Sequence, residues 1–312
     1  MFETLVELER GGLIESVHAG SMVLLNADGS VQFKVGDIDA TMYPRSTSKL
    51  FQAAGMLELG LDVDDRELAL VAASHSGGET HVEIVRGILQ RSGLDESHLK
   101  CIVGMPLGRP ERLAYQAQGG VAAAIRTDCS GKHAGFLATC VAQGWDVDSY
   151  LDESHPLQQH LKDAVADAVD DELAITTIDG CGAPLFSMSL HALARGYRKA
   201  LLSDPATELG RVARAMKTYP ELVGGEGREA TLAAQSGTLA KDGAEAVFAM
   251  AHEDGRACAI KIGDGSKRAL APVVNAVLNS WGLEPILPVM PVLGGGVVRG
   301  ELRIAAAVSS AI

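Results

Sequence analysis

Residues 43–55 of the chain, YPRSTSKLFQAAG, place two serines and one lysine at the expected start of an amphipathic helix. Residues three positions apart share a helix face, so Ser46 Oγ and Lys49 Nζ can meet within the first turn. A serine hydroxyl becomes a nucleophile when a neutral lysine accepts its proton, and burial or nearby positive charge lowers the lysine pKa for this purpose. The spacing is therefore compatible with a Ser-Lys pair that attacks a carbonyl carbon.

The same residues also have a purely structural interpretation. Serine is a favoured helix N-cap, so Ser46 could serve only to begin the helix. The spacing S-x-x-K occurs again at Ser97 and Lys100, in SHLK, which shows that it arises by chance in a chain of this length. Spacing alone therefore leaves both interpretations of Ser46 open.

Two later segments gather chemically active residue types at the edges of apolar stretches. They are TDCSGKHAGFL at 127–137 and TIDGCGAPLFS at 177–187, and such clusters are typical of functional loops. Taken one by one, Cys129 and Cys181 could be buried thiols and His133 a helix residue with satisfied hydrogen bonds. Their combination with the serine motif favours a shared functional site.

The elements that must position these residues change character twice along the chain. Residues 4–36 read as short strands with NADG as a hairpin turn, and helical periodicity extends from Ser46 to about residue 215. Strand patterns return after residue 230, with a helix near 266–281 and a last strand at 301–308. The simplest packing joins both groups of strands in one sheet.

The expected fold class is α+β, with a mostly antiparallel sheet built from both chain ends and flanked by helices, plus a central helical lobe. Residues 1–45 and 230–312 would form a discontinuous sheet domain, and residues 46–229 the mainly helical lobe. Because Ser46 stands at the junction of the two, we expect one compact catalytic unit with its active site between the lobes.

Composition and charge exclude several classes of protein. A chain of 312 residues with 47% hydrophobic content can bury a sizeable core. A net charge of −13 without a Lys/Arg cluster argues against nucleic acid and anionic membranes as partners, because phosphates need concentrated positive charge. The N-terminus lacks a basic start followed by an apolar run, and five widely spaced cysteines do not suggest a disulfide framework. We expect a cytoplasmic protein without a membrane span.

Three motifs together resemble those of one protein family. RS-x-x-K at 45–49, CSGKH at 129–133 and DGCGAP at 179–184 occur in the order found in the L-asparaginase II family of the Rhizobium etli type. The last two motifs are far more specific than S-x-x-K. The resemblance implies the fold of serine β-lactamases and penicillin-binding proteins (β-lactamase/transpeptidase-like) and the hydrolysis of L-asparagine to L-aspartate and ammonia.

The resemblance also implies roles for individual residues. Ser46 is the expected nucleophile and Lys49 its base, and a second Ser-Lys pair is expected from Ser74 in AASHSGGE and Lys261 in CAIKIGDG. Ser76 is the alternative to Ser74 because it lies in the same turn. A second lysine close to the first would disfavour its charge and thereby favour the neutral base.

Three side chains are expected to hold the substrate. Arg45, next to the nucleophile, offers a planar cation for the α-carboxylate of asparagine, although a surface ion pair would explain this arginine equally well. His133 and Lys132 of CSGKH are the other expected substrate contacts.

The resemblance further implies one zinc ion per chain, bound by Cys129, Lys132 and Cys181. Two thiolates suit zinc, while lysine is an uncommon ligand that must be neutral to coordinate. Asp179 could orient one of these ligands, or it could simply form the turn in IDGCG.

Two positions depart from the family pattern. Leu50 follows the motif lysine where Pro is common, and this affects the start of the helix rather than the chemistry. Asp128 precedes CSGKH where we expect Asn, and its extra carboxylate could alter metal affinity or the preference among amides.

The expected function is an L-asparaginase that acts on its small-molecule substrate through a Ser-Lys acyl-enzyme, as a homodimer. The alternatives are a glutaminase or another serine amidohydrolase of the β-lactamase fold, a non-catalytic amino-acid-binding protein, and a structural zinc protein. Ammonia release from asparagine and from glutamine distinguishes the first two classes.

Overall fold

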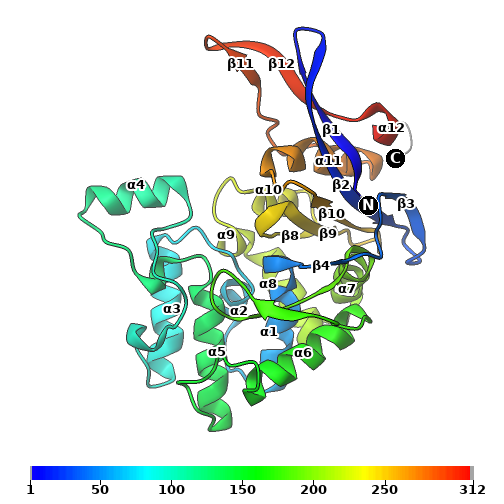
Figure 1. The fold of residues 1–312 in the computed structure, drawn as a ribbon. Coiled ribbons are helices and arrows are strands. Elements are labelled where there is room, and N and C mark those ends of the chain that lie inside the picture. Colours follow the sequence, from blue (N-terminus) through cyan, green and yellow to red (C-terminus); the bar gives the residue numbers. More distant parts are fainter. Residues whose placement is uncertain (1, 310–312) are drawn as a thin grey trace.

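The computed structural model describes residues 2–309 and contains a large sheet made from both ends of the chain (Figure 1). The strand order is β11-β12-β1-β2-β10-β9-β8, and β3 takes the place of β1 beside the second half of β2. Neighbouring strands are antiparallel, so the expected sheet and the α+β fold class are confirmed. Its strands are β1 (Glu3–Arg10), β2 (Leu13–Leu25), β3 (Val31–Val35), β8 (Leu239–Asp242), β9 (Val247–Ala251), β10 (Ala257–Ile262), β11 (Val292–Gly294) and β12 (Val297–Ile304).

Alternating side chains of the central strands explain why both faces of the sheet are covered. Val23 and Leu25 of β2 belong to the core shared with the helical lobe. Met22 and Leu24 point to the opposite face, into a second core with helix α11 (Leu270–Ser280). Because successive residues serve two cores, the second half of β2 reads as a continuous apolar run and not as an alternating strand.

The second layer consists of helices from the middle of the chain. Helix α7 lies against β2, β9 and β10, while α1 packs among α5, α6 and α8 (Figure 1). Two short strand pairs, β4 (Thr41–Met42) with β7 (Met188–Ser189) and β5 (Thr176–Ile178) with β6 (Pro184–Phe186), lie outside the main sheet. The helices are α1 (Lys49–Glu58), α2 (Asp65–Val71), α3 (Glu79–Arg91), α4 (Arg109–Ala117), α5 (Ser130–Gln143), α6 (Pro156–Val169), α7 (Leu190–Leu202), α8 (Glu208–Thr218), α9 (Pro220–Val223) and α10 (Glu229–Gln235).

Local sequence signals account for several helix ends. Asp64 and Glu67 form a capping box at the start of α2, and Pro156 occupies the first turn of α6. Gly144 ends α5 with a φ of 69°, in the left-handed region that glycine adopts easily. The expected last strand at 301–308 is too long, because β12 stops at Ile304 and the short helix α12 (Ala306–Ser309) follows.

Two parts of the described chain project from the body (Figure 1). The β1–β2 hairpin and β11–β12 extend beyond α11, and α4 stands apart on a long connection without a buried residue of its own. Within residues 2–309, no helix is both long and apolar enough to cross a membrane.

Candidate active site

Ser46 lies in the 3-10 helix η1 (Arg45–Ser48), directly before α1. Arg45 has a φ of 53°, a left-handed conformation that costs a non-glycine residue roughly 1 kcal/mol or more. Ser46 caps neither helix, because η1 begins after Pro44 and Ser48 stands at the cap position of α1. Among the described residues Ser46 Oγ has no hydrogen-bond partner, and its side chain lines two cavities. The N-cap interpretation of Ser46 is therefore wrong.

Lys49 is buried in the first turn of α1 and is only 1% exposed. Its Nζ donates to Ser74 Oγ at 3.1 Å and to Cys129 Sγ at 3.2 Å. Among the described residues no hydrogen bond joins Lys49 Nζ to Ser46 Oγ, although the two residues are three positions apart. Burial lowers the pKa of Lys49, but negative charge nearby, at Cys129 first, outweighs burial and raises it above the ordinary value.

Ser74 and Ser76 lie in the loop between α2 and α3, with different surroundings. Ser74 Oγ accepts the hydrogen bond from Lys49, and Ser74 lines the same cavity as Ser46. Ser76 Oγ is buried and has no hydrogen-bond partner within residues 2–309. The geometry therefore brings Ser74, and not Ser76, to the motif lysine.

Two adjoining cavities of about 190 and 180 Å³ share Ser46, Asp128 and Ala244 as lining residues. The first is also lined by Ser74, Leu107, Arg228, Asp242, Gly243 and Lys267. The second is also lined by Arg45, Ile102, Cys129, Asp179, Gly180 and Cys181. Ser46 therefore stands where the two spaces meet, and the 190 Å³ space is called the cationic cavity below because two of its lining side chains are Arg228 and Lys267.

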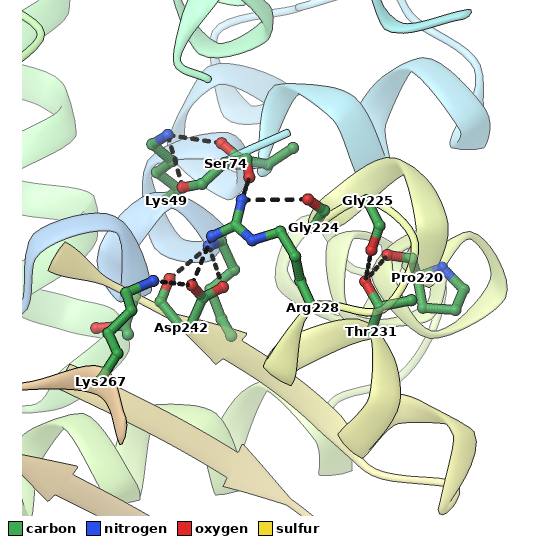
Figure 2. A network of polar contacts seen from close by, with 12 residues as sticks. Lys49, Ser74, Pro220, Gly224, Gly225, Arg228, Thr231, Asp242 and Lys267 are labelled. Atoms are coloured by element: carbon green, nitrogen blue, oxygen red, sulfur yellow. Dashed lines mark hydrogen bonds and ion pairs between the residues drawn. The ribbon is translucent and has the colours of Figure 1, made fainter. Parts of the chain in front are cut away.

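A buried carboxylate, Asp242, binds Arg228 and Lys267 beside Ser74 (Figure 2), and Lys241 is a third cation next to it. Asp242, at the end of β8, is 1% exposed, and its Oδ2 accepts from Arg228 Nη2 at 2.6 Å and from Lys267 Nζ at 2.8 Å. Lys241 Nζ lies 3.5 Å from Oδ1 of the same carboxylate. Burial alone would raise the pKa of Asp242, but the three cations hold it well below its ordinary value.

Lys241, rather than Lys261, is the second lysine near Lys49. Lys241 is fully buried on β8, and burial lowers its pKa to about 8, with the positive charge of Lys49 adding to the effect. Lys261 Nζ instead donates to the backbone carbonyls of Glu245 and Ile262. Among the described residues no hydrogen bond joins Lys261 to Ser74, although burial and then the positive charge of nearby Arg45 lower the pKa of Lys261.

The three residues expected to bind zinc do meet. Lys132 Nζ donates to Cys181 Sγ at 3.3 Å, and Cys129 and Cys181 are hydrogen-bonded to each other. This bond raises the pKa of the Cys129 thiol and lowers that of Cys181. Over residues 2–309, no cluster of three or more His, Cys, Asp or Glu side chains is arranged to hold a metal. A metal at this place would therefore depend on Lys132 as a ligand.

His133 and Lys132, expected at the substrate, and Asp179, expected beside a zinc ligand, have the following surroundings in the structure. His133 is completely buried, its Nδ1 lies 2.8 Å from Tyr150 Oη, and neither His133 nor Lys132 lines either of the two cavities. Asp179 Oδ1 accepts from Arg45 Nε at 2.8 Å, so Asp179 holds Arg45 rather than a cysteine or Lys132. The alternative of an ion pair for Arg45 is what the structure shows.

Four residues of the site were missed by reasoning from the sequence: Lys241, Asp242, Arg228 and Lys267. The sequence does carry one signal for Lys241 and Asp242. In β-lactamases and penicillin-binding proteins, the S-x-x-K motif is accompanied by a second motif of the form K-x-G. Lys241, Asp242 and Gly243 fit this pattern at the end of β8. Arg228 and Lys267 carry no comparable sequence signal.

The sequence model of L-asparaginase II matches residues 6–289. The chain belongs to the L-asparaginase II family. It is therefore an amidohydrolase by family, with the family's CSGKH and DGCGAP motifs bordering the second cavity. No curated protein sequence matched the chain.

Solved structures with similar folds have low sequence identity to this chain. A β-lactamase from Mycobacterium bovis is 15% identical with a TM-score of 0.48, over 84% of this chain and 94% of that one. A Bacillus glutaminase is 13% identical with a TM-score of 0.38, over 85% of this chain and 91% of that one. The protein Mglu in its native form is 12% identical with a TM-score of 0.38, and the match spans 85% of this chain but 61% of Mglu.

Proposed function

We propose that this L-asparaginase II family member hydrolyses L-asparagine to L-aspartate and ammonia through an acyl-enzyme on Ser46. The observation that carries the proposal is the meeting of Ser46 and Ser74 at one small cavity, with Lys49 hydrogen-bonded to Ser74. A cavity of about 190 Å³ suits a free amino acid better than a polymer.

The chemistry follows from these positions. Ser46 Oγ attacks the carbon of the side-chain amide, and its proton passes through Ser74 Oγ, which is bonded to Lys49, to the neutral form of that lysine. Because the groups around Lys49 raise its pKa, the neutral form is the minority at neutral pH, and turnover should rise with pH. The carbon-nitrogen bond breaks, ammonia leaves with that proton, and an ester joins the substrate to Ser46. Water then attacks the ester carbon, Ser46 regains its proton, and L-aspartate is released.

The negative charge that develops on the amide oxygen needs donors beside Ser46. Ser46 and Ala244 both border the two cavities, and both stand in the first turn of a 3-10 helix, where N–H groups have no partner within the helix. Gly243 lets β8 approach this point, because a Cβ on Gly243 would lie 3.3 Å from the Ser46 nitrogen. We assign the N–H groups of Ser46 and Ala244 to the oxyanion.

The residues at the expected zinc site fit that ion. Two buried thiols and Lys132 converge, and the buried imidazole of His133 lies against Cys181. When bound, zinc would draw negative charge from both sulfurs and fix them in place beside Lys49. Cys129 and Lys132 come from the start of α5, so the same residues that hold the ion also anchor the wall of the second cavity.

The test of the function is ammonia release by the wild type and by Ser46→Ala, with L-asparagine and L-glutamine as substrates. The wild type should prefer asparagine, and mass spectrometry of the quenched reaction should find one aspartyl group on the peptide with Ser46. Ser46→Ala should lose turnover and the adduct. Ser97→Ala, from the second S-x-x-K, is the matched control and should keep both. Turnover by Ser46→Ala above a tenth of wild type, or a clear preference for glutamine, would contradict the proposal.

Metal content is measured separately from activity. Protein purified without chelator should hold about one zinc per chain, and both Cys129→Ser and Cys181→Ser should lose it because each removes a thiolate. Cys258 is buried at the other face of the sheet, so Cys258→Ser should keep the ion. A zinc-free wild type would remove the site from the proposal and leave the serine chemistry untouched.

A further inference from the structure

The cationic cavity has a recognition surface that the chemistry at Ser46 does not use. Lys267, in the 3-10 helix η5 (Lys267–Ala269), is 41% exposed, and Arg228, directly before α10, is 17% exposed; both line the cavity. Ser46 lines the same space.

The two cations are held in place without being fully neutralised. Both donate to Oδ2 of Asp242, so one carboxylate serves two side chains in addition to Lys241. Lys267 has three donors and uses one of them among the described contacts. Arg228 uses both hydrogens of Nη1 on the carbonyls of Ser74 and Gly224, which fixes its guanidinium against the loop of Ser74. A surplus of positive charge therefore faces the cavity (Figure 2).

An opposite charge stands at the junction of the two cavities. Asp128 lines both, next to Ser46, and its carboxylate makes no hydrogen bond to another described residue. It is the residue found where asparagine was expected from the motif. The cationic cavity thus presents positive charge at one side and a free carboxylate near the nucleophile.

We propose that Lys267 and Arg228 bind the α-carboxylate of the substrate and that Asp128 binds its α-ammonium group. This inference rests on the proposed function and deepens it, because it makes the enzyme specific for free amino acids that carry both charges. It also moves the carboxylate away from Arg45, whose Nε is already bonded to Asp179 in the second cavity. An asparagine within a peptide lacks both charges and would not be held.

The test measures binding to Ser46→Ala, which cannot turn the ligand over, by isothermal titration calorimetry. The ligands are L-asparagine and succinamate, which has the amide and the carboxylate but no ammonium group. Lys267→Gln in this background should lower the binding affinity for both ligands about tenfold or more. This is the range expected for the loss of a hydrogen bond to a charged group. Lys267→Arg should restore most of the affinity, and Lys34→Gln, an exposed lysine on β3, should leave it unchanged.

Asp128→Asn separates the two halves of the proposal. It should lower the affinity for L-asparagine about tenfold. The affinity for succinamate should stay the same or rise, because succinamate has no ammonium group that could lose its partner. If Lys267→Gln and its parent bind L-asparagine with equal affinity, the carboxylate assignment is overturned. If Asp128→Asn loses affinity for L-asparagine and for succinamate to the same extent, the ammonium assignment is overturned. If the wild type hydrolyses asparagine while either result appears, only this inference fails. If it releases no ammonia from asparagine, the proposed function fails.

Discussion

The hydroxyl groups of Ser74 and Ser76 lie two residues apart and differ in what surrounds them. Ser74 Oγ bonds to Lys49, so Ser74→Ala should reduce kcat about 100-fold or more, the usual effect of losing a proton relay. Ser76 Oγ is buried without a partner, so Ser76→Ala should keep kcat and leave the free energy of unfolding equal or slightly higher. Steady-state kinetics and urea unfolding of both variants check this. If Ser76→Ala lowers kcat more than Ser74→Ala does, the proton relay is Ser76.

Arg45 combines a strained backbone with an ion pair, and substitutions separate the two. A left-handed φ of 53° costs alanine about as much as arginine, whereas glycine adopts it freely. Both Arg45→Ala and Arg45→Gly lose the bond to Asp179. We therefore expect Arg45→Gly to be more stable than Arg45→Ala by about 1 kcal/mol in the free energy of unfolding. Equal stability would show that the conformation carries no strain.

Which site residues could be predicted from the sequence depends on how they are distributed along it. Cys129 and Lys132 lie in one short motif at the start of α5, and Cys181 lies in a second short motif. These two motifs are enough to predict that the three residues share a site. For Lys241 the sequence offers only the short K-x-G pattern of residues 241–243. Every residue of β8 is buried, so the strand shows no alternation that would orient its lysine, and η1 beside it belongs to a distant segment. Only the strand order, with β8 at the edge next to η1, brings Lys241 to the site.

At the scale of elements, helix boundaries are also only partly predictable from the sequence. The apolar spacing after Lys49 predicts α1 correctly, but the turn that carries Ser46 is a separate 3-10 helix and not the first turn of α1. The fold class was predictable, because strand patterns at both chain ends flank a helical centre. The sequence context favours Lys261 as the second lysine, whereas in the structure Ser74 is bonded to Lys49 and the lysine on which the charge of Lys49 acts is Lys241.

Close packing of α5 against α2 gives a prediction at this scale. A Cβ on Gly131 would lie 2.5 Å from the backbone oxygen of Leu70, which cannot move aside without shifting α2. Gly131→Ala should therefore lower the free energy of unfolding by about 1 to 3 kcal/mol. Gly87 in α3 is the matched control, because the nearest atom to its added Cβ is 3.6 Å away. Gly87→Ala should raise stability by about 0.5 to 1 kcal/mol. Urea unfolding that ranks the two variants the other way would refute the close contact.

At the scale of the whole molecule, the site depends on how the sheet and the helical layer are held together. β8 provides Lys241 and Asp242, while the helical layer provides Ser46 and Ser74. Asp242 connects them, because Arg228 bonds both to its carboxylate and to the carbonyl of Ser74. The charges that stabilise this junction are also those that face the substrate, so folding and recognition share one set of groups.

The pH dependence of stability tests the burial of Lys241 at that junction. Its pKa is about 8 in the folded protein and about 10.4 in an unfolded chain, because burial disfavours the charged form. Between these values the unfolded chain binds more protons, so the free energy of unfolding should rise with pH. For this group the rise is on the order of 3 kcal/mol. Lys241→Met cannot titrate and should lack it, while Arg228 and Lys267 still satisfy Asp242. Urea unfolding of both proteins from about pH 7.5 to 10.5 gives the difference, and parallel curves would mean that Lys241 is not buried as the structure places it.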